Sequence, residues 1–442
     1  MKPITRPKTD AQPMFGWSLE MVLDPSQELY RLAGLIDWAA LEAEFGSLYC
    51  PDNGRPGVPI RLMAGLHFLK HTFKLSDEEV VHRWVENPYY QFFTGEEFFQ
   101  HKLPINPSQM TKWRKRIGEK GVERLLQLTI QAGLRTKTIT ERSVDRVIVD
   151  TTVQPKAIAH PTDARLYRKI HAAMMRIAKA EAVHLHQSYS RTVKASFHQH
   201  ARYAKAKHFK RARREQKRLK VCAGRLMRHV VNRLSDEAYD RHKWTFILSD
   251  LILTQKRKSK AKIYSLHASE VECIAKGKAH RPYEFGVKVS LAVTHKEGFC
   301  VGIQSCPENP YDGHTLEDQI DQVERLTGKV PKLTFVDRGY KGHGVPEERT
   351  RVLMSGTRKL GPTLKLQLRR RSAIEPEIGH MKADGLLGRN FLKGMQGDAI
   401  NALLCGAGHN LRKILARLRL LWLWFATLLV VPCEPEMVPQ AG

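Results

Sequence analysis

The chain has 442 residues, with 73 Lys and Arg against 45 Asp and Glu, and so carries a formal net charge of +28. A charge of this size attracts polyanions over a long range, which favours nucleic acid as the partner over a merely soluble basic protein. The length allows about two or three domains. A content of 42% hydrophobic residues is enough to form their cores.

The sequence gives no sign of export or of a cofactor-binding loop. Its first residues lack the apolar core of a signal peptide, and its seven scattered cysteines contain no C-x-x-C pair. The apolar run Leu420 to Val431 is shorter than the roughly 20 residues of a membrane span. It predicts a core helix or a subunit contact, with a membrane-surface site as the alternative. The cysteine pattern fits a reducing, cytoplasmic location. No phosphate-loop motif occurs, so we expect no nucleotide cofactor.

The first third of the chain is predicted to form several short helices. Pro59 to His71 has apolar residues at helical spacing, and Ser76 and Glu79 form a capping box at the start of a second helix. Ser108 is expected to cap a third helix that ends near Ile117.

The third of these helices is basic, which suits a helix-turn-helix reader of DNA. The alternative is that the short amphipathic helices only pack together, with Trp113 in their core. We predict that this helix contacts DNA through four side chains around Trp113, namely Lys112, Arg114, Lys115 and Arg116.

A long basic segment, at about 160–262, is predicted to form helices with few interruptions between Arg165 and Leu234. From Ala201 to Val230, twelve Lys and Arg accompany one acidic residue, Glu215. Such a surface neutralises phosphates, although a solvated helical face is the simpler alternative. We predict DNA contact by Lys210, Arg211, Arg213, Arg214, Lys217 and Arg218.

Two strand-like segments each contain a short β-branched apolar stretch that closes on an aspartate. They are Arg146 to Thr152, with Asp150, and Leu333 to Tyr340, with Asp337. Each stretch suits a buried strand whose last residue emerges at a sheet edge, where ligand sites collect. Between them the sequence predicts a hairpin over 285–303 and then an amphipathic helix. A right-handed crossover into a parallel neighbour would bring the two aspartates side by side.

A third carboxylate follows in a predicted helix. Glu375 lies four residues after Arg371 and seven before Lys382, so the three share one helix face. Glu377 is a rival, but about 200° of helix separates it from Glu375, and only one of the two can point into a site. Pro376 either kinks this helix or marks its first turn.

Several residues near these motifs have a simpler interpretation. Asp312 is expected to terminate a turn and Thr315 to cap the next helix, without a catalytic role for Asp312. For Arg371 and Lys382 the alternative is ordinary pairing with the glutamate on a helix surface.

The three carboxylates of Asp150, Asp337 and Glu375 predict a metal site. Hard divalent cations take oxygen ligands, and two metal ions close together activate an attacking water or hydroxyl and stabilise the leaving oxygen of a phosphodiester. We therefore expect two Mg²⁺ ions, for which Mn²⁺ can substitute. These features together predict a metal-dependent phosphoryl-transfer enzyme.

In this order the motifs resemble those of the DDE transposases of bacterial insertion sequences, specifically the insertion-sequence-five family. The resemblance covers nearly the whole chain, and the stretch from Leu35 to Arg116 is similar to the family's helical domain. One departure is Leu368, where the family often has Tyr. The motifs that carry the resemblance are Val149-Asp150-Thr151-Thr152, Val336-Asp337-Arg338-Gly339-Tyr340, and the spacing of Arg371, Glu375 and Lys382.

The resemblance implies an α/β fold with a ribonuclease-H-like catalytic core, a mixed sheet flanked by helices. The expected organisation is an all-α DNA-binding domain at 1–140 and a catalytic domain at 141–432, interrupted by the helical basic insertion, with a short tail at 433–442.

It also implies recognition of terminal inverted repeats and Mg²⁺-dependent cleavage and strand transfer. Asp150, Asp337 and Glu375 would be catalytic metal ligands, and Arg371 and Lys382 would offset phosphate charge. The partners would be double-stranded repeat and target DNA and further copies of the chain, in a dimer or larger assembly on the bacterial nucleoid. The alternatives are a stand-alone nuclease with the same core and a non-catalytic protein that only binds inverted repeats.

Overall fold

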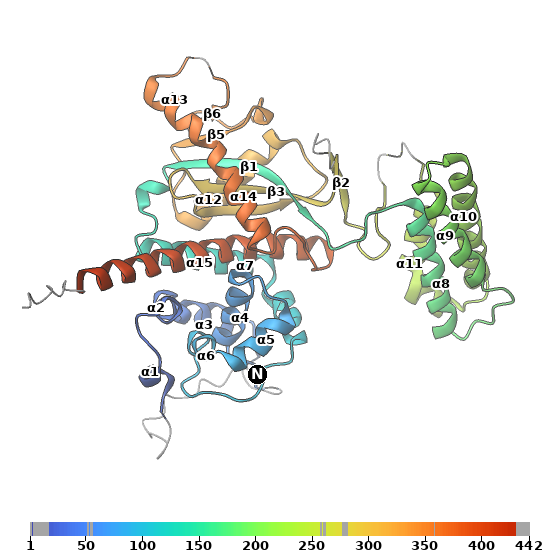
Figure 1. Ribbon diagram of the computed structural model, residues 1–442, viewed down its shortest axis with the longest axis horizontal. Coiled ribbons are helices and arrows are strands. Elements are labelled where there is room, and N and C mark those ends of the chain that lie inside the picture. Colours follow the sequence, from blue (N-terminus) through green and yellow to red (C-terminus); the bar gives the residue numbers. More distant parts are fainter. Residues whose placement is uncertain are drawn as a thin grey trace, which may run out of the picture.

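The computed structural model describes residues 17–50, 56–256, 262–275, 282–357 and 359–429, together with residues 2, 53 and 259. The side chains of 421–429 and the predicted tail at 433–442 lie outside what it describes. Figure 1 shows three separate parts, which are the N-terminal helices, a sheet with its covering helices, and a helical insertion. Within the described residues, no helix has the length and apolar character needed to cross a membrane.

The N-terminal region is helical, as predicted. The capping box is present: the Ser76 amide donates to the Glu79 carboxylate over 2.7 Å, and the Glu79 amide donates to the Ser76 hydroxyl over 3.0 Å. The helices are α1 (Leu19–Val22), α2 (Glu28–Leu35), α3 (Trp38–Gly46), α4 (Ile60–Thr72), α5 (Asp77–Glu86), α6 (Pro88–Phe93) and α7 (Ser108–Arg135).

The basic helix is longer than predicted. It begins at Ser108 itself, whose side chain does not cap it, and continues to Arg135. Gly118, with φ of 63°, interrupts it close to the predicted end at Ile117. The prediction stopped at this glycine and so missed the second half of the helix, in which Leu125 and Leu126 are fully buried.

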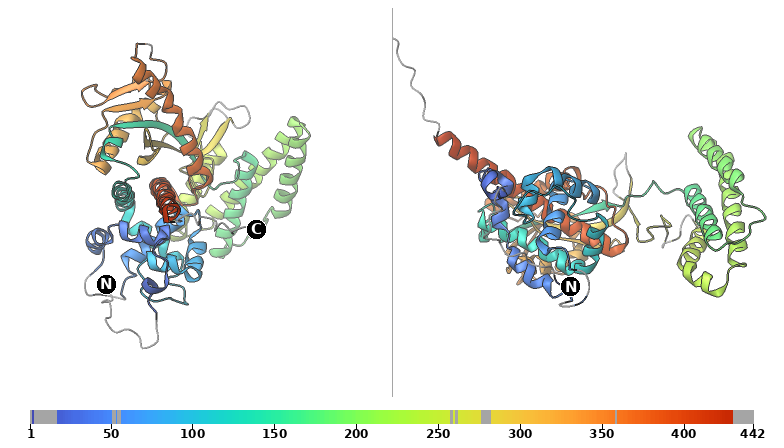
Figure 2. Two further views of the ribbon diagram at one scale, coloured as in Figure 1. Left: turned by 60° about the vertical axis from the view of Figure 1, so that its left-hand side comes forward. Right: turned by 90° about the horizontal axis from the view of Figure 1, so that it is seen from below.

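The insertion consists of helices, as predicted, and has a core of its own. Ile170, Met174, Leu226 and Val230 are fully buried within it. The insertion stands apart from the rest of the chain in Figure 1 and in the right-hand view of Figure 2. Its helices are α8 (Asp163–Ala180), α9 (Ser190–Lys205), α10 (Phe209–Val231) and α11 (Asp236–Thr254).

A six-stranded mixed sheet forms the centre of the molecule. Strand β1 is antiparallel to β3 and parallel to β5, β5 is parallel to β6, and β2 and β4 both pair with β3. The predicted hairpin and the predicted parallel neighbour are therefore confirmed. The strands are β1 (Arg146–Pro155), β2 (Glu272–Ala275), β3 (Tyr283–Thr294), β4 (Cys300–Cys306), β5 (Leu333–Val336) and β6 (Arg351–Met354).

Helices cover both faces of this sheet. Val147 and Val149 of β1 pack with α12, whereas Ile148 between them packs on the opposite side with residues of α15. The remaining helices are α12 (Leu316–Thr327), α13 (Pro362–Arg369), α14 (Ile374–Ala383) and α15 (Gly394–Leu429).

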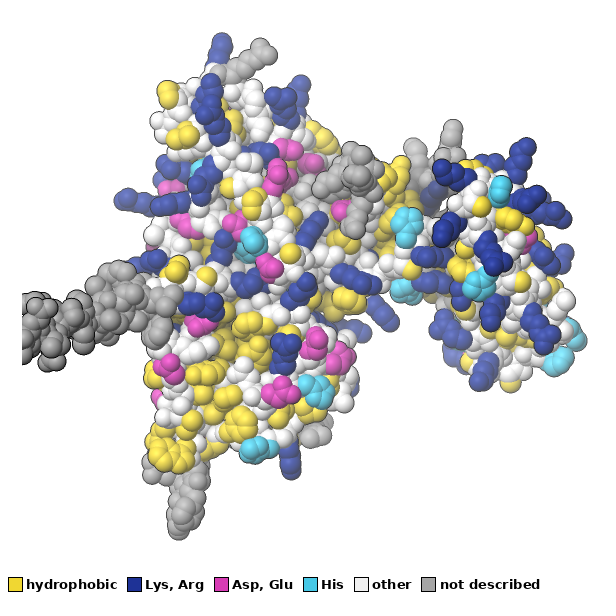
Figure 3. All heavy atoms as spheres, in the orientation of Figure 1, with side chains coloured by type: hydrophobic (Ala, Val, Ile, Leu, Met, Phe, Trp, Pro, Cys, Tyr) yellow, Lys and Arg dark blue, Asp and Glu magenta, His cyan; other side chains and the backbone are white. Residues whose placement is uncertain are grey.

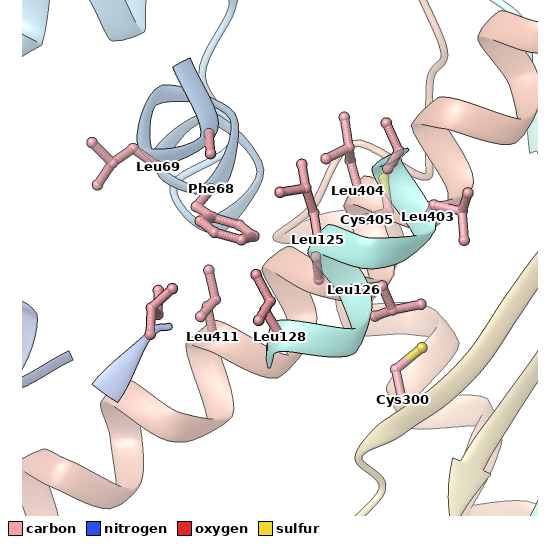
Figure 4. Packing of buried hydrophobic residues seen from close by; sticks show 14 of the residues in the cluster. Phe68, Leu69, Leu125, Leu126, Leu128, Cys300, Leu403, Leu404, Cys405 and Leu411 are labelled. Carbon is pink, nitrogen blue, oxygen red and sulfur yellow. The ribbon is translucent and has the colours of Figure 1, made fainter. Parts of the chain in front are cut away.

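Helix α15 joins the N-terminal helices to the sheet. Its Leu403, Leu404 and Leu411 meet side chains of α4 and α7 in one buried cluster that continues to the start of β4 (Figure 4). A Cβ added at Gly408 would lie 2.4 Å from the carbonyl oxygen of His71, so glycine permits the close approach of α15 to α4. The hydrophobic core is therefore continuous across the domain boundary that was predicted at residue 140.

Candidate active site

The parallel pairing of β1 with β5 positions two aspartates. Ile148 pairs with Phe335, and Asp150 and Asp337 each follow two residues later. The prediction that Asp150 ends its strand is wrong, because β1 continues to Pro155. The edge of β1 is nevertheless open there, since β5 ends at Val336. Both carboxylates therefore lie where β5 leaves the sheet.

An arginine links the first aspartate to the third carboxylate. One guanidinium nitrogen of Arg371 lies 3.7 Å from Asp150 Oδ2, and the other lies 3.9 Å from Glu375 Oε1. Arg371 belongs to a 3₁₀ turn that precedes α14, and Pro376 lies in the first turn of α14, where it was one of two predicted positions. Figure 1 shows α14 crossing the sheet near β1.

The third carboxylate, that of Glu375, lies apart from those of Asp150 and Asp337. The Glu375 side chain is 67% exposed, whereas that of Asp150 is 18% exposed. Within the described part of the chain, no three His, Cys, Asp or Glu side chains are grouped closely enough to hold a metal ion. Lys382 lies in the last turn of α14 and is partly buried.

Glu377 points away from this site, toward α15. Lys413 donates to its Oε1 over 2.9 Å, and His409 Nε2 lies 3.3 Å from its Oε2. Burial alone would raise the pKa of Glu377, but these two partners outweigh burial and lower the pKa below its ordinary value. Of the two rival glutamates, Glu375 is the one on the side of Asp150.

Asp312, for which no catalytic role was predicted, lies beside the two aspartates. Its Oδ1 accepts hydrogen bonds from Lys288 Nζ over 2.8 Å and from the Thr151 hydroxyl over 3.0 Å. Thr151 is the residue after Asp150. Thr315 does not cap α12 through its side chain, because its hydroxyl donates to the Asp312 carbonyl. The sequence signal that could have identified Asp312 is the short polar segment that follows the predicted hairpin.

Two further features lie close to these carboxylates. Asp337 Oδ1 accepts a hydrogen bond from the Gly339 amide over 2.8 Å, and a Cβ added at Gly339 would lie 3.4 Å from Asp312 Oδ2, so the two carboxylates lie on either side of this glycine. The hydroxyl of Tyr340 is buried and has no hydrogen-bond partner. Burial raises the pKa of Tyr340 well above its ordinary value, and the nearby carboxylates of Asp150, Asp312 and Asp337 add to the effect. Carboxylate oxygens around a small polar space are suitable donors for a hard divalent cation.

One of the four residues predicted to contact DNA in α7 is misassigned. Arg114 is 3% exposed and forms a paired contact with the carboxylate of Asp77, at 2.9 and 2.6 Å. It therefore stabilises the packing of α7 against α5. The other three, Lys112, Lys115 and Arg116, are exposed.

The predicted basic residues of the insertion are all exposed. They lie on α10, in which nine of 23 residues are Lys or Arg and one is acidic. Figure 3 shows Lys and Arg side chains spread over the visible face of the insertion, with few acidic side chains among them. The six residues are Lys210, Arg211, Arg213, Arg214, Lys217 and Arg218.

Comparison with known proteins gives three findings. Residues 17–116 match a family described as "Transposase domain (DUF772)", and residues 254–410 match one described as "Transposase DDE domain". The second match includes Asp337, Arg371, Glu375 and Lys382, whereas Asp150 precedes it. An uncharacterised protein of Rhizobium meliloti, ORF8 in the nfe locus, is 53% identical over 209 residues, which are 47% of this chain and all of that protein. No solved structure matches this chain.

Because the two glutamate side chains point in different directions, their removal is predicted to affect stability to different extents. Glu377→Ala removes the carboxylate that Lys413 and His409 share, so we expect the free energy of unfolding to fall by about 2 kcal/mol. Glu375→Ala, at an exposed position, should change it by less than about 0.5 kcal/mol. Urea unfolding of both variants measures the difference, and equal losses would contradict the assignment of the two side chains.

Proposed function

The chain belongs to the DDE transposases of insertion sequences, metal-dependent enzymes that cleave DNA and transfer its strands, and we propose that Asp150, Asp337 and Glu375 are its metal-binding carboxylates. The observation that carries this proposal is the pairing of β1 with β5, which places Asp150 beside Asp337. The ion pairs of Arg371 with Asp150 and Glu375 support the third assignment.

The ions proposed are two Mg²⁺, with Mn²⁺ as a substitute. When bound, they supply an activated water or hydroxyl and stabilise the leaving oxygen of a phosphodiester. The chain's own basic residues then neutralise the DNA. Arg371 is already at the edge of the site, and its planar guanidinium suits a phosphate that approaches Asp150. Lys382 lies on the same helix as Glu375 and offsets phosphate charge beside it.

The fold around the site supports a ribonuclease-H-like core. The support is the strand arrangement, in which β4, β3, β1, β5 and β6 follow one another across a mixed sheet with the two aspartates at its open edge. The insertion between β1 and β2 leaves this arrangement intact. We assign the chain to the insertion-sequence-five family on the motifs that surround Asp150, Asp337 and Glu375.

Recognition of the terminal inverted repeats is assigned to the N-terminal helices. Lys112, Lys115 and Arg116 are exposed along one helix, and long basic side chains of this kind position a helix on the DNA backbone. Since both ends of an element must be processed together, we also propose a dimer or larger assembly on DNA.

The insertion is proposed as a second DNA-binding surface. Exposed cations with so few acidic partners repel one another unless an anion lies against them. A DNA duplex, with its closely spaced phosphates, is such an anion.

The proposal is tested by cleavage and joining of labelled DNA that carries the repeats flanking the chain's own gene, in Mg²⁺. Asp150→Asn, Asp337→Asn and Glu375→Gln should each abolish both reactions, because each removes one carboxylate from the metal site. Glu377→Gln is the matched control, since it makes the same change two residues away on the other side of the helix. It should keep both reactions.

Other outcomes of this assay support the rival functions. Cleavage without any joined product would favour a stand-alone nuclease. Binding of the repeats without cleavage, in Mg²⁺ or Mn²⁺, would favour a protein that only binds DNA. Loss of activity in Glu377→Gln instead of Glu375→Gln would overturn the assignment of the third carboxylate.

The insertion is tested by the salt dependence of DNA binding. Lys210, Arg214 and Lys217 share one face of α10, and their combined change to Gln should lower the slope of log K against log salt by roughly 0.9 for each phosphate that the variant leaves unneutralised. The control changes Arg325, Lys329 and Lys332, which are paired with acidic residues, to Gln. An equal slope in both variants and in the parent protein would count against DNA binding by the insertion.

A further inference from the structure

We propose that helix α11 of the insertion is a contact between two copies of this chain, in which two α11 helices pack antiparallel about a two-fold axis near Ile247. The proposed function, on which this inference rests, requires two copies to act together on DNA. The contact at α11 names a surface through which they meet.

The first support is a group of large apolar side chains on the outer face of α11. Trp244, Ile247 and Leu251 are 65%, 38% and 50% exposed, and their spacing of three and four residues places them on one side of the helix. Single apolar residues are common on protein surfaces, but a contiguous group marks an interaction site. These three residues are called the α11 stripe below.

The opposite side of α11 already belongs to the core of the insertion. Phe246 and Ile252 are buried in one cluster with side chains of α8 and α10, and Leu248 is buried as well. The second half of α11 is therefore apolar on both sides. A helix that is apolar all round is expected to be covered all round, so the stripe needs a partner.

The charge of α11 favours a second copy over DNA as this partner. α11 has four acidic and two basic residues, whereas α10 has nine basic residues and one acidic residue. Asp236, Glu237 and Asp240 stand at the start of α11, where they repel phosphates. Two insertions, each strongly basic elsewhere, therefore repel each other least when they meet through α11.

The order of the charges beside the stripe determines the direction of the pair. Lys243 and Asp250 are exposed and lie seven residues apart, on the same flank of the stripe. In an antiparallel pair centred near Ile247, Lys243 lies opposite the partner's Asp250, and Trp244 lies opposite the partner's Leu251. A parallel pair would instead place lysine opposite lysine and aspartate opposite aspartate.

Lys243 can change its partner at little cost. Its Nζ lies 3.7 Å from Asp240 Oδ1 of the same helix, and both side chains are exposed. An exposed pair of this kind contributes little to stability. The contact with the partner's Asp250, beside a stripe that excludes water, would be the stronger of the two.

The apolar part of the contact is tested by the dissociation constant of the dimer, measured by sedimentation equilibrium on the full-length protein without DNA. Trp244→Ala and Leu251→Ala should each raise this Kd on the order of tenfold or more, because each change removes a large apolar side chain from both copies. Phe209→Ala is the matched control. It removes an exposed aromatic ring from α10 of the same insertion and should leave the Kd unchanged.

A charge exchange tests the direction of the pair. Lys243→Glu and Asp250→Lys each place like charges opposite each other and should weaken the dimer several-fold. The double variant, with Lys243→Glu and Asp250→Lys together, restores opposite charges and should return the Kd toward that of the parent protein. The two residues are two turns apart in their own helix, so this rescue reports a contact between copies.

A Kd that is equal in Trp244→Ala, Leu251→Ala and the parent protein would overturn the inference and assign the contact to another surface. A monomeric parent protein would also overturn it. If the affinity of such a monomer for repeat DNA falls in Trp244→Ala but not in Phe209→Ala, the stripe binds DNA instead. Failure of the double variant to restore the dimer would contradict the antiparallel arrangement. The proposed function is judged separately, by cleavage and joining of the repeat DNA.

Discussion

Several carboxylates lie close together at one edge of the sheet, and the structure around them depends on positive charge that offsets their repulsion. Asp150 faces Arg371, and Asp312 faces Lys288. Among the residues that the structure describes, no Lys, Arg or His comes within ion-pair distance of Asp337. Arg371 and Lys288 therefore offset part of this negative charge, and the proposed metal ion would offset the rest.

The position of this edge depends on elements that are far apart in the sequence. The insertion separates β1 from β2, yet β1 still pairs with both β3 and β5. Helix α15 supports one face of the sheet and carries Lys413 and His409, which hold Glu377 and so set the rotation of α14. The direction of Glu375 therefore follows from a contact made two residues later, on the other side of its helix.

Local patterns in the sequence were sufficient to predict much of this fold. Alternating and β-branched residues predicted the hairpin and both aspartate strands, and the capping box at Ser76 predicted the start of α5. Patterns of this kind depend on neighbours along the chain. The continuation of β1 to Pro155 was missed because these residues pair with β3, which lies more than a hundred residues later in the sequence.

The errors at individual residues share this cause. Arg114 has the sequence context of an exposed basic helix, but the folded chain brings Asp77 against it and buries the pair. Asp312 has the context of a turn, but its partners Thr151 and Lys288 come from two distant strands. Charge and spacing identify which residues can act, whereas tertiary contacts decide which of them face the site.

The central claim is that Asp150 is a ligand of the metal site, so that Arg371, 3.7 Å from its Oδ2, competes with a cation for this carboxylate in the DNA-free protein. The most direct measurement is the Kd for Mn²⁺ of Arg371→Ala without DNA, beside Arg369→Ala as a control at an exposed position. The loss of a competing positive charge within 4 Å of Asp150 predicts tighter Mn²⁺ binding, on the order of tenfold, in the first variant only. An unchanged or weaker affinity in Arg371→Ala would contradict the claim.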